Sequence, residues 1–110
     1  MGRTAGRTKW DQAPPGDLDL TMINASLRTL AGQLAEAALP DPAWASHPAT
    51  GATGVLADVA DIRDGLAYWT RVLAEFSVIR LHVTQKEVAR TLGISTQTIN
   101  RWVNDPLLTD

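Results

Sequence analysis

The chain contains no cysteine among its 110 residues. This absence excludes disulfides, thiolate metal sites and cysteine nucleophiles. No stretch approaches the roughly twenty apolar residues that a membrane-spanning helix needs, and no apolar run follows the basic N-terminus as it does in a signal peptide. The sequence therefore predicts a cytoplasmic protein without a membrane segment. Its length allows one domain with a modest core.

Residues suited to catalysis or metal binding are also scarce. The chain has two histidines. His47 has no second ligand near it in the sequence, and His82 has no nucleophile in a catalytic arrangement with it. Residues 51–54, Gly-Ala-Thr-Gly, lack the spacing and the lysine of a phosphate-binding loop. We therefore expect no enzymatic activity, no metal and no cofactor.

The net charge of −2 is unevenly distributed along the chain. Residues 1–10 carry +3, residues 11–62 carry −6 and residues 63–103 carry +3, while Asp105 and Asp110 supply the remaining −2. Salt limits the reach of a charge to about 8–10 Å, so the local sign decides whether a polyanion can bind. Two basic regions are thus available despite the acidic total.

A first long helix is predicted over residues 17–39. Its apolar residues recur at alternating steps of three and four, the repeat of helix packing. They are Leu20, Ile23, Leu27, Leu30, Leu34 and Ala37. Asp17 and Asp19 favour its N-terminus, and Pro40 ends it. Residues 40–54 are rich in proline and glycine and are predicted to form a linker.

A second long helix is predicted from about Val55 to about Arg80. Its apolar stripe has the same repeat and consists of Val55, Val59, Ile62, Leu66, Trp69, Leu73 and Phe76. Beyond Gly65 a second stripe joins it, made of Tyr68, Val72 and Ile79. A helix that is apolar on two sides is covered on two sides, here by the first helix and by the residues that follow. Residues 76–83 contain enough β-branched side chains to form a short strand, but we favour a helix for this segment.

Residues 84–103 indicate two short helices joined by a tight turn. Gly93 supplies the turn because it adopts positive φ without steric cost. Ser95 caps the second helix, and Ala89 is small enough to let the two helices cross closely. The residues expected in the core of this unit are Val88, Ala89, Leu92, Gly93, Ile94, Ile99 and Trp102.

Seven positions of this segment resemble the helix-turn-helix superfamily, as found in phage repressors, resolvases and transposases. They are Gln85, Ala89, Gly93, Ile94, Ser95, Ile99 and Trp102. The resemblance covers residues 84–103 and does not select a narrower family. Together with the two stripes it implies an all-α fold. An N-terminal helical hairpin, or a pair of dimerisation helices, would precede a trihelical helix-turn-helix unit.

In this motif the second helix lies in the DNA major groove, so the outward side of helix 95–104 is predicted to read base edges. The base-reading residues would be Thr96, Gln97, Asn100 and Arg101. Phosphate contacts are predicted from the first helix N-terminus and from nearby polar or basic side chains. These are Thr84, Gln85, Lys86, Arg90, Ser95 and Arg80. The alternative interpretation is that these side chains are ordinary solvated residues.

The chain then divides into a flexible basic arm (1–16), a packing or dimerisation region (17–65) and the DNA-binding unit (66–110). The arm is either a solvated terminus or a second DNA contact.

The predicted partner is double-stranded DNA, and the predicted function is that of a small transcriptional repressor of phage, plasmid or actinobacterial type. One motif buries little surface, which favours a homodimer through helices 17–39 and 55–80, although these can also close on each other within one chain. The alternative function is an antitoxin, partition or recombination accessory protein whose N-terminal helices bind a partner protein.

Overall fold

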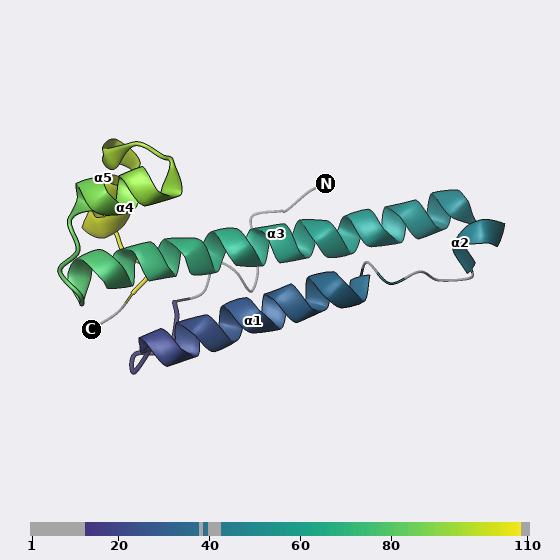
Figure 1. Ribbon diagram of the computed structural model, residues 1–110, viewed down its shortest axis with the longest axis horizontal. Helices are drawn as coiled ribbons and strands as arrows, with labels where there is room; N and C mark the ends of the chain where they lie inside the picture. The colour runs from purple at the N-terminus through teal and green to yellow at the C-terminus, as the bar shows by residue number, and fades with distance from the viewer. Residues whose placement is uncertain (1–12, 38, 40–42, 109–110) are drawn as a thin grey trace.

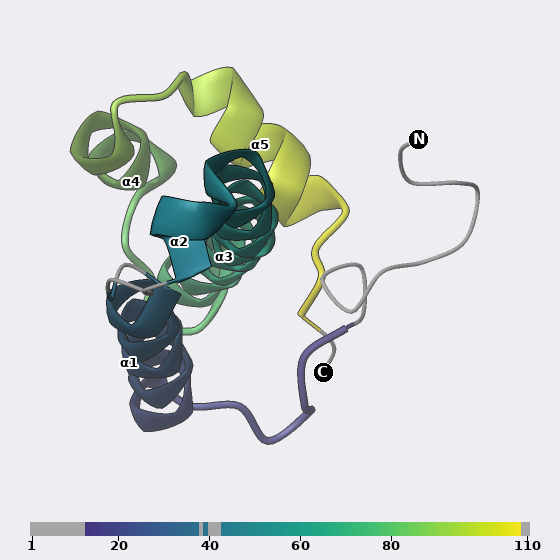
Figure 2. The ribbon, with the colours of Figure 1, turned by 90° about the vertical axis from the view of Figure 1, so that its right-hand side faces the viewer.

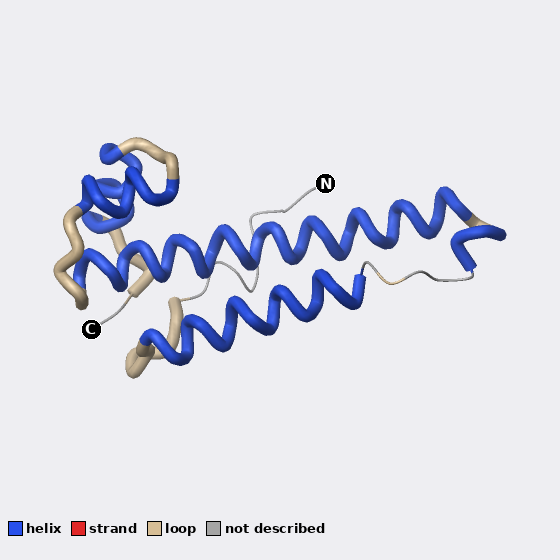
Figure 3. Tube along the Cα trace, in the orientation of Figure 1, coloured by secondary structure: helices blue, strands red, loops and turns tan. Residues whose placement is uncertain are grey.

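The computed structural model describes residues 13–37, 39 and 43–108, and in these ranges the regular structure is entirely helical (Figure 3). The predicted all-α fold class is confirmed. The helices are, in chain order, α1 (Leu20–Ala37), α2 (Ala43–Ser46), α3 (Pro48–Ile79), α4 (Gln85–Leu92) and α5 (Thr96–Asn104). None of these helices has the length together with the apolar character that spanning a membrane would take.

Helix α3 is the element on which the others are assembled. It has 32 residues and accounts for most of the 53 Å length of the molecule. Helix α1 packs antiparallel along it, so the two form a hairpin within one chain (Figure 1). Figure 2 looks along α3 and shows α1 on one side of it and α4 with α5 on the other. The C-terminal half of α3 is therefore covered on two sides.

The first core cluster joins α1, α3 and the segment after α5. Its buried members are Leu18, Ile23, Tyr68, Val72, Phe76 and Leu108. Leu107 packs against the same cluster. The chain thus returns from α5 to the α1–α3 hairpin, which connects the C-terminal unit to the N-terminal helix.

The second core cluster lies between α3 and the two short helices. Its buried members are Ala74, Val88, Ala89 and Ile99, and Val78, Val83, Trp102 and Val103 pack against it. The stripe of Tyr68, Val72 and Ile79 packs in the first cluster instead. The side of α3 that faces the short helices is formed by Ala74 and Val78, and the small Ala74 permits their close approach.

The predicted linker over residues 40–54 is wrong, because α3 begins at Pro48 and not near Val55. Proline suits the first turn of a helix, where its missing N–H is not needed. The amide of Gly51 already donates to the carbonyl of His47 at 2.9 Å. The ring of Trp44 from α2 lies where a side chain on Gly51 would be. Local contacts therefore extend the helix through a stretch of low helix propensity.

Helix α1 also begins later than predicted, at Leu20 and not at Asp17. Asp19 is the residue that acts at this terminus, since its Oδ1 accepts from the backbone N–H of Met22 at 2.9 Å. The predicted arm is described only for residues 13–16, because residues 1–12 lie outside the described ranges. Within that part, Pro14 is buried, so packed structure begins before Asp17.

The end of α3 resolves the choice between helix and strand for residues 76–83. The helix continues to Ile79, and a short loop then leads to α4 without a strand. In this loop the N–H of Val83 donates to the carbonyl of Ser77 at 2.9 Å. His82 takes a positive φ of 61°, which turns the chain toward α4.

Candidate nucleic-acid interface

Each end of α4 is fixed by local hydrogen bonds. The hydroxyl of Thr84 accepts from the backbone N–H of Glu87 at 3.1 Å, which caps the N-terminus. At the other end Gly93 has a φ of 71°, as expected for the turn. The N–H of Ile94 donates to the carbonyl of Ala89 at 3.1 Å. This is the Schellman arrangement, and it sets the direction in which the chain leaves the helix.

The start of α5 is capped by Ser95, as expected. Its hydroxyl accepts from the backbone N–H of Thr98 at 3.1 Å and lies 2.9 Å from the hydroxyl of the same residue. The turn between the helices therefore consists of Gly93 to Ser95. Both capping residues use local chemistry that depends on the sequence alone.

The orientation of α5 follows from what it buries. Ile99 is fully buried against α3 and α4, and Trp102 is half-buried. The guanidinium of Arg71 on α3 lies 5.8 Å from the ring centre of Trp102, within cation–π range. With that side fixed, the opposite side of α5 faces solvent. All four predicted base-reading residues are exposed, namely Thr96, Gln97, Asn100 and Arg101, and of these Gln97 and Arg101 lie most directly opposite Ile99.

Three residues expected in the motif core, Leu92, Gly93 and Ile94, lie at its surface instead. Leu92 is 38% exposed and Ile94 is 37% exposed. For Leu92 the physical reason is a gap beside α4, because it lines an open apolar cavity together with Leu27 of α1 and Leu73 of α3. Gly93 and Ile94 belong to the exposed turn between the two short helices. Helical periodicity correctly gives the side on which Leu92 lies, but nothing in the described chain closes over it.

The predicted phosphate-binding residues differ in their exposure and in whether their side chains already have a partner within the fold. Lys86 is exposed, and Gln85 beside it is half-buried. Arg90 is paired with Glu87 one turn away on the surface of α4. Arg80 is half-buried and already has an interaction within the fold. The hydroxyls of Thr84 and Ser95 are engaged as caps. Among the charged members of this set, Lys86 is therefore the best placed to meet an incoming phosphate.

A buried carboxylate that the sequence analysis did not single out positions the end of α5. Glu75 of α3 is 0% exposed. Its Oε1 accepts from the backbone N–H groups of Leu107 at 2.8 Å and Leu108 at 3.0 Å, and its Oε2 accepts from Arg71 at 2.7 Å. Arg71 in turn donates to the carbonyl of Asp105 at 2.8 Å. The two stripes did not signal this burial, because Glu75 lies outside them, between the Tyr68–Val72–Ile79 stripe and the side formed by Ala74 and Val78. Once buried there, its carboxylate needs a partner.

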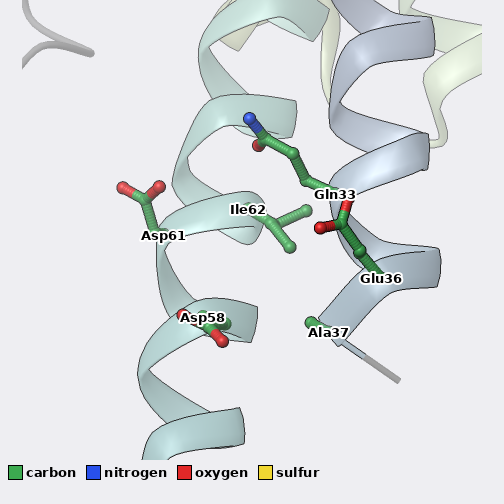
Figure 4. A pocket seen from close by; sticks show the side chains of 6 residues that line it. All are labelled: Gln33, Glu36, Ala37, Asp58, Asp61 and Ile62. Carbon is green, nitrogen blue, oxygen red and sulfur yellow. The ribbon is translucent and has the colours of Figure 1, made fainter. Parts of the chain in front are cut away.

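The acidic side chains of the hairpin gather at a different place, toward the far end of α1. They line a cavity of ≈ 340 Å³ between α1 and α3 (Figure 4), formed by Gln33, Glu36, Ala37, Asp58, Asp61 and Ile62. In the figure Asp61 points away from α1. Across the described residues no three potential ligands converge as a metal site would require. This negative region lies away from the outward side of α5.

Comparison with known proteins agrees with this geometry. The family model described as helix-turn-helix matches residues 79–108, which contain the end of α3, both short helices and the segment that Glu75 holds. No curated protein and no solved structure matches the chain. Residues 79–108 therefore form a helix-turn-helix unit, the motif of a DNA-binding superfamily.

Proposed function

We propose that this protein is a sequence-specific double-stranded DNA-binding regulator that reads the major groove with α5. The observation that carries the proposal is the division of α5 into two sides. Ile99 and Trp102 fix one side against the fold, and the other presents Gln97 and Asn100 to solvent. A helix held in this way offers polar side chains whose positions do not depend on the DNA.

The exposed residues of α5 have the chemistry that base reading needs. A Gln or Asn amide can bond bidentately to adenine, Arg101 can do so to guanine, and the methyl group of Thr96 can contact the thymine methyl. Three of the four base-reading residues are uncharged. Specificity would then come from hydrogen-bond geometry, and less from attraction to phosphate.

The remaining affinity would come from phosphate contacts around α4. Lys86 is exposed near its N-terminus, where free backbone N–H groups also favour anions. Arg101 extends the positive charge along the same unit. Because the chain as a whole carries −2, we expect modest affinity for DNA of arbitrary sequence.

The regulatory effect we propose is repression by occlusion, in which the bound protein covers a promoter. Such a protein would act in the cytoplasm of a bacterial host. Arginine outnumbers lysine by eight to two, which favours a GC-rich genome such as that of an actinobacterium, its phage or its plasmid.

The proposal is tested by selecting bound sequences from a random duplex pool and measuring their affinity across a salt series. We expect one enriched motif, and we expect Gln97→Ala and Asn100→Ala to weaken it by about 10- to 100-fold at that site, since one base contact contributes ~1–3 kcal/mol. Gln33→Ala, an exposed substitution of the same type on α1, is the matched control. Equal affinity for every sequence would show the proposal to be wrong.

A second candidate is favoured by leucines of α1 that remain exposed far from α5, Leu34 among them. They would suit an antitoxin, partition or recombination accessory protein that binds DNA and holds a different protein on its helices. A stoichiometric complex with one heterologous protein, purified from the native host and reconstituted from pure components, would support this function.

A further inference from the structure

One side of the α1–α3 hairpin carries large apolar residues that the fold leaves exposed or only half-buried. They recur at intervals of seven residues, as Leu20, Leu27 and Leu34 in α1 and as Val59, Leu66 and Leu73 in α3. We call these six residues the leucine face. Leu20 is 51% exposed, Leu34 is 43% exposed and Leu66 is 38% exposed. Side chains of this size are normally covered when they follow a packing repeat.

The two rows lie on the same side of the hairpin. Leu27 and Leu73 line one cavity of ≈ 290 Å³, together with Leu92 of α4. Seven residues make nearly two helical turns, so Leu34 and Leu66 lie on the same side as these two. Figure 2 shows α1 and α4 both bordering this side of α3. The leucine face is therefore continuous with the uncovered part of the helix-turn-helix unit.

Few charged side chains border this face. Arg63 lies between Val59 and Leu66 along α3, and it is paired with Asp64. The acids of the hairpin, Glu36, Asp58 and Asp61, line the separate cavity of Figure 4. Glu87 lines the leucine cavity, but its carboxylate is paired with Arg90. Other positions that line it are uncharged, such as Thr70. Two such faces can approach each other with little desolvation cost and little repulsion between like charges, although the chain is acidic.

We propose that the leucine face binds a second copy of this chain, so that two hairpins pack face to face as a four-helix bundle. Two antiparallel helices with heptad rows are self-complementary: a two-fold axis places α1 of one protomer on α3 of its partner and closes every row. Any apolar helix could contact one row. A second hairpin with the same spacing covers both rows at once, which is why we infer a homodimer.

The size of the face sets how much of such an interface the hairpin can supply. At 1.5 Å per residue, α1 is about 27 Å long and α3 about 48 Å, and two helices side by side are about 20 Å wide. The two helices lie side by side only over the length of α1, so their joint footprint is about 540 Å². This is about two thirds of the roughly 800 Å² per partner of a standard interface, and the adjoining side of α4 around Leu92 would supply the rest.

One consequence of the dimer rests on the proposed function, namely the spacing between the two DNA half-sites. Because Leu92 of α4 borders the leucine face, pairing the faces would fix both helix-turn-helix units relative to each other. Each α5 would then read one half of a palindrome, with half-sites separated by about one helical turn or a multiple of it.

The oligomeric state of the full-length chain tests the proposal. Sedimentation across a concentration series should give twice the 11.9 kDa chain mass for the wild type. Leu34→Glu combined with Leu66→Glu should raise the dimer dissociation constant at least about 100-fold, since each burial is lost in both copies. Leu56→Glu is the matched control. It lies on α3 and is 67% exposed, but it lines another cavity, with Trp44.

A cross-linking experiment keeps the test decisive if the double variant is unfolded by circular dichroism. Because the chain has no cysteine, Leu66→Cys or Leu34→Cys introduces one reactive thiol. A short bis-maleimide should link two such chains, and it should link Leu56→Cys far less. A monomeric wild type, or cross-linking that is equal at all three positions, would overturn the proposal, as would a dimer that survives in a folded double variant.

The two proposals fail separately. A monomer that still selects one DNA sequence leaves base reading by α5 intact and removes only the dimer. A dimer that binds all DNA equally removes base reading and leaves the leucine face. A wild type that is monomeric alone and pairs only with a different protein favours the accessory function described above.

Discussion

The carboxylate of Glu75 accepts a hydrogen bond from the backbone N–H of Leu108 at 3.0 Å, across 33 positions of sequence. The acceptor is fully buried in α3, and the donor follows α5 in the chain. Arg71 supplies the opposite charge at 2.7 Å and also bonds to the carbonyl of Asp105. One ion pair in α3 thus determines where α5 ends and where the chain returns to the core.

Removing this carboxylate should destabilise the protein strongly. Glu75→Ala leaves two backbone N–H groups and the Arg71 guanidinium without their acceptor, and breaking a buried pair in this way costs about 3–5 kcal/mol. Urea unfolding measures the loss. The matched control is Glu87→Ala, which breaks the exposed pair with Arg90 and should cost no more than about 1 kcal/mol. Equal losses in the two variants would contradict the role given to Glu75.

Alanine should have opposite effects at two glycines. Gly93 has a φ of 71° and open space around a new Cβ, so Gly93→Ala adds only backbone strain, about 1–2 kcal/mol of destabilisation. Gly32 lies within α1, also with open space, and Gly32→Ala should stabilise by about 0.5–1 kcal/mol. Thermal unfolding of both variants checks the signs. A stabilising Gly93→Ala would be incompatible with the left-handed turn.

A second glycine pair reports on the contact between α2 and α3. A methyl group on Gly51 would meet the ring of Trp44, whereas one on Gly54 would meet nothing. Gly51→Ala should therefore cost about 1–3 kcal/mol through overpacking, and Gly54→Ala should be neutral or stabilising. The emission of Trp44 is obtained by subtracting the spectrum of a matching Trp44→Phe variant, since the chain has four tryptophans. Its wavelength should shift in Gly51→Ala and stay constant in Gly54→Ala.

Alkaline titration should reveal the environment of the single tyrosine. Burial, with a smaller effect from the negative charge of Glu75, raises the pKa of Tyr68 above its usual 10.0. The unfolded chain therefore ionises first as pH rises past about 10, and the contribution of Tyr68 to stability is lost between that pH and the higher folded pKa. Tyrosinate absorbance at 295 nm measures this pKa directly. Tyr68→Phe should lose less stability above pH 10 than the wild type does.

The phosphate contacts predict a change in salt dependence. Lys86→Ala should weaken binding to all DNA sequences alike and reduce the slope of log K against log salt by about 1. Gln97→Ala should leave that slope unchanged, because it removes no charge. Affinities measured between low and physiological salt distinguish the two. A Lys86→Ala variant that alters sequence preference would argue against a phosphate contact.

The features that were predictable from the sequence are those that depend only on residues nearby in the sequence. Gly93 and Ser95 carry their turn and cap chemistry wherever they occur, and the burial of Ile99 follows from the period of α5. The start of α3 was not predictable in this way. Two glycines argue against a helix, and the compensating contact comes from Trp44, whose position depends on tertiary packing.

Leu92 and Glu75 show the same limit for side chains. Periodicity places Leu92 on the apolar side of α4, but its exposure depends on how far α1 stands from that helix. Glu75 lies outside both apolar stripes, so its burial was not predictable from them, and its backbone hydrogen-bond partners lie more than thirty positions away at Leu107 and Leu108. Which residues read bases remains a prediction, since it requires a DNA complex.

The burial of Leu108 among residues of α1 and α3 has a consequence for protein engineering. The segment 79–108 that matches the family is not a self-sufficient cassette, because its last residues complete a core whose other members, such as Leu18 and Ile23, come from the start of the described chain. Excised or grafted onto another carrier, the segment would expose Leu107 and Leu108 and lose the acceptor for their amides. A transplantable reader of DNA would have to take α1 and α3 with it.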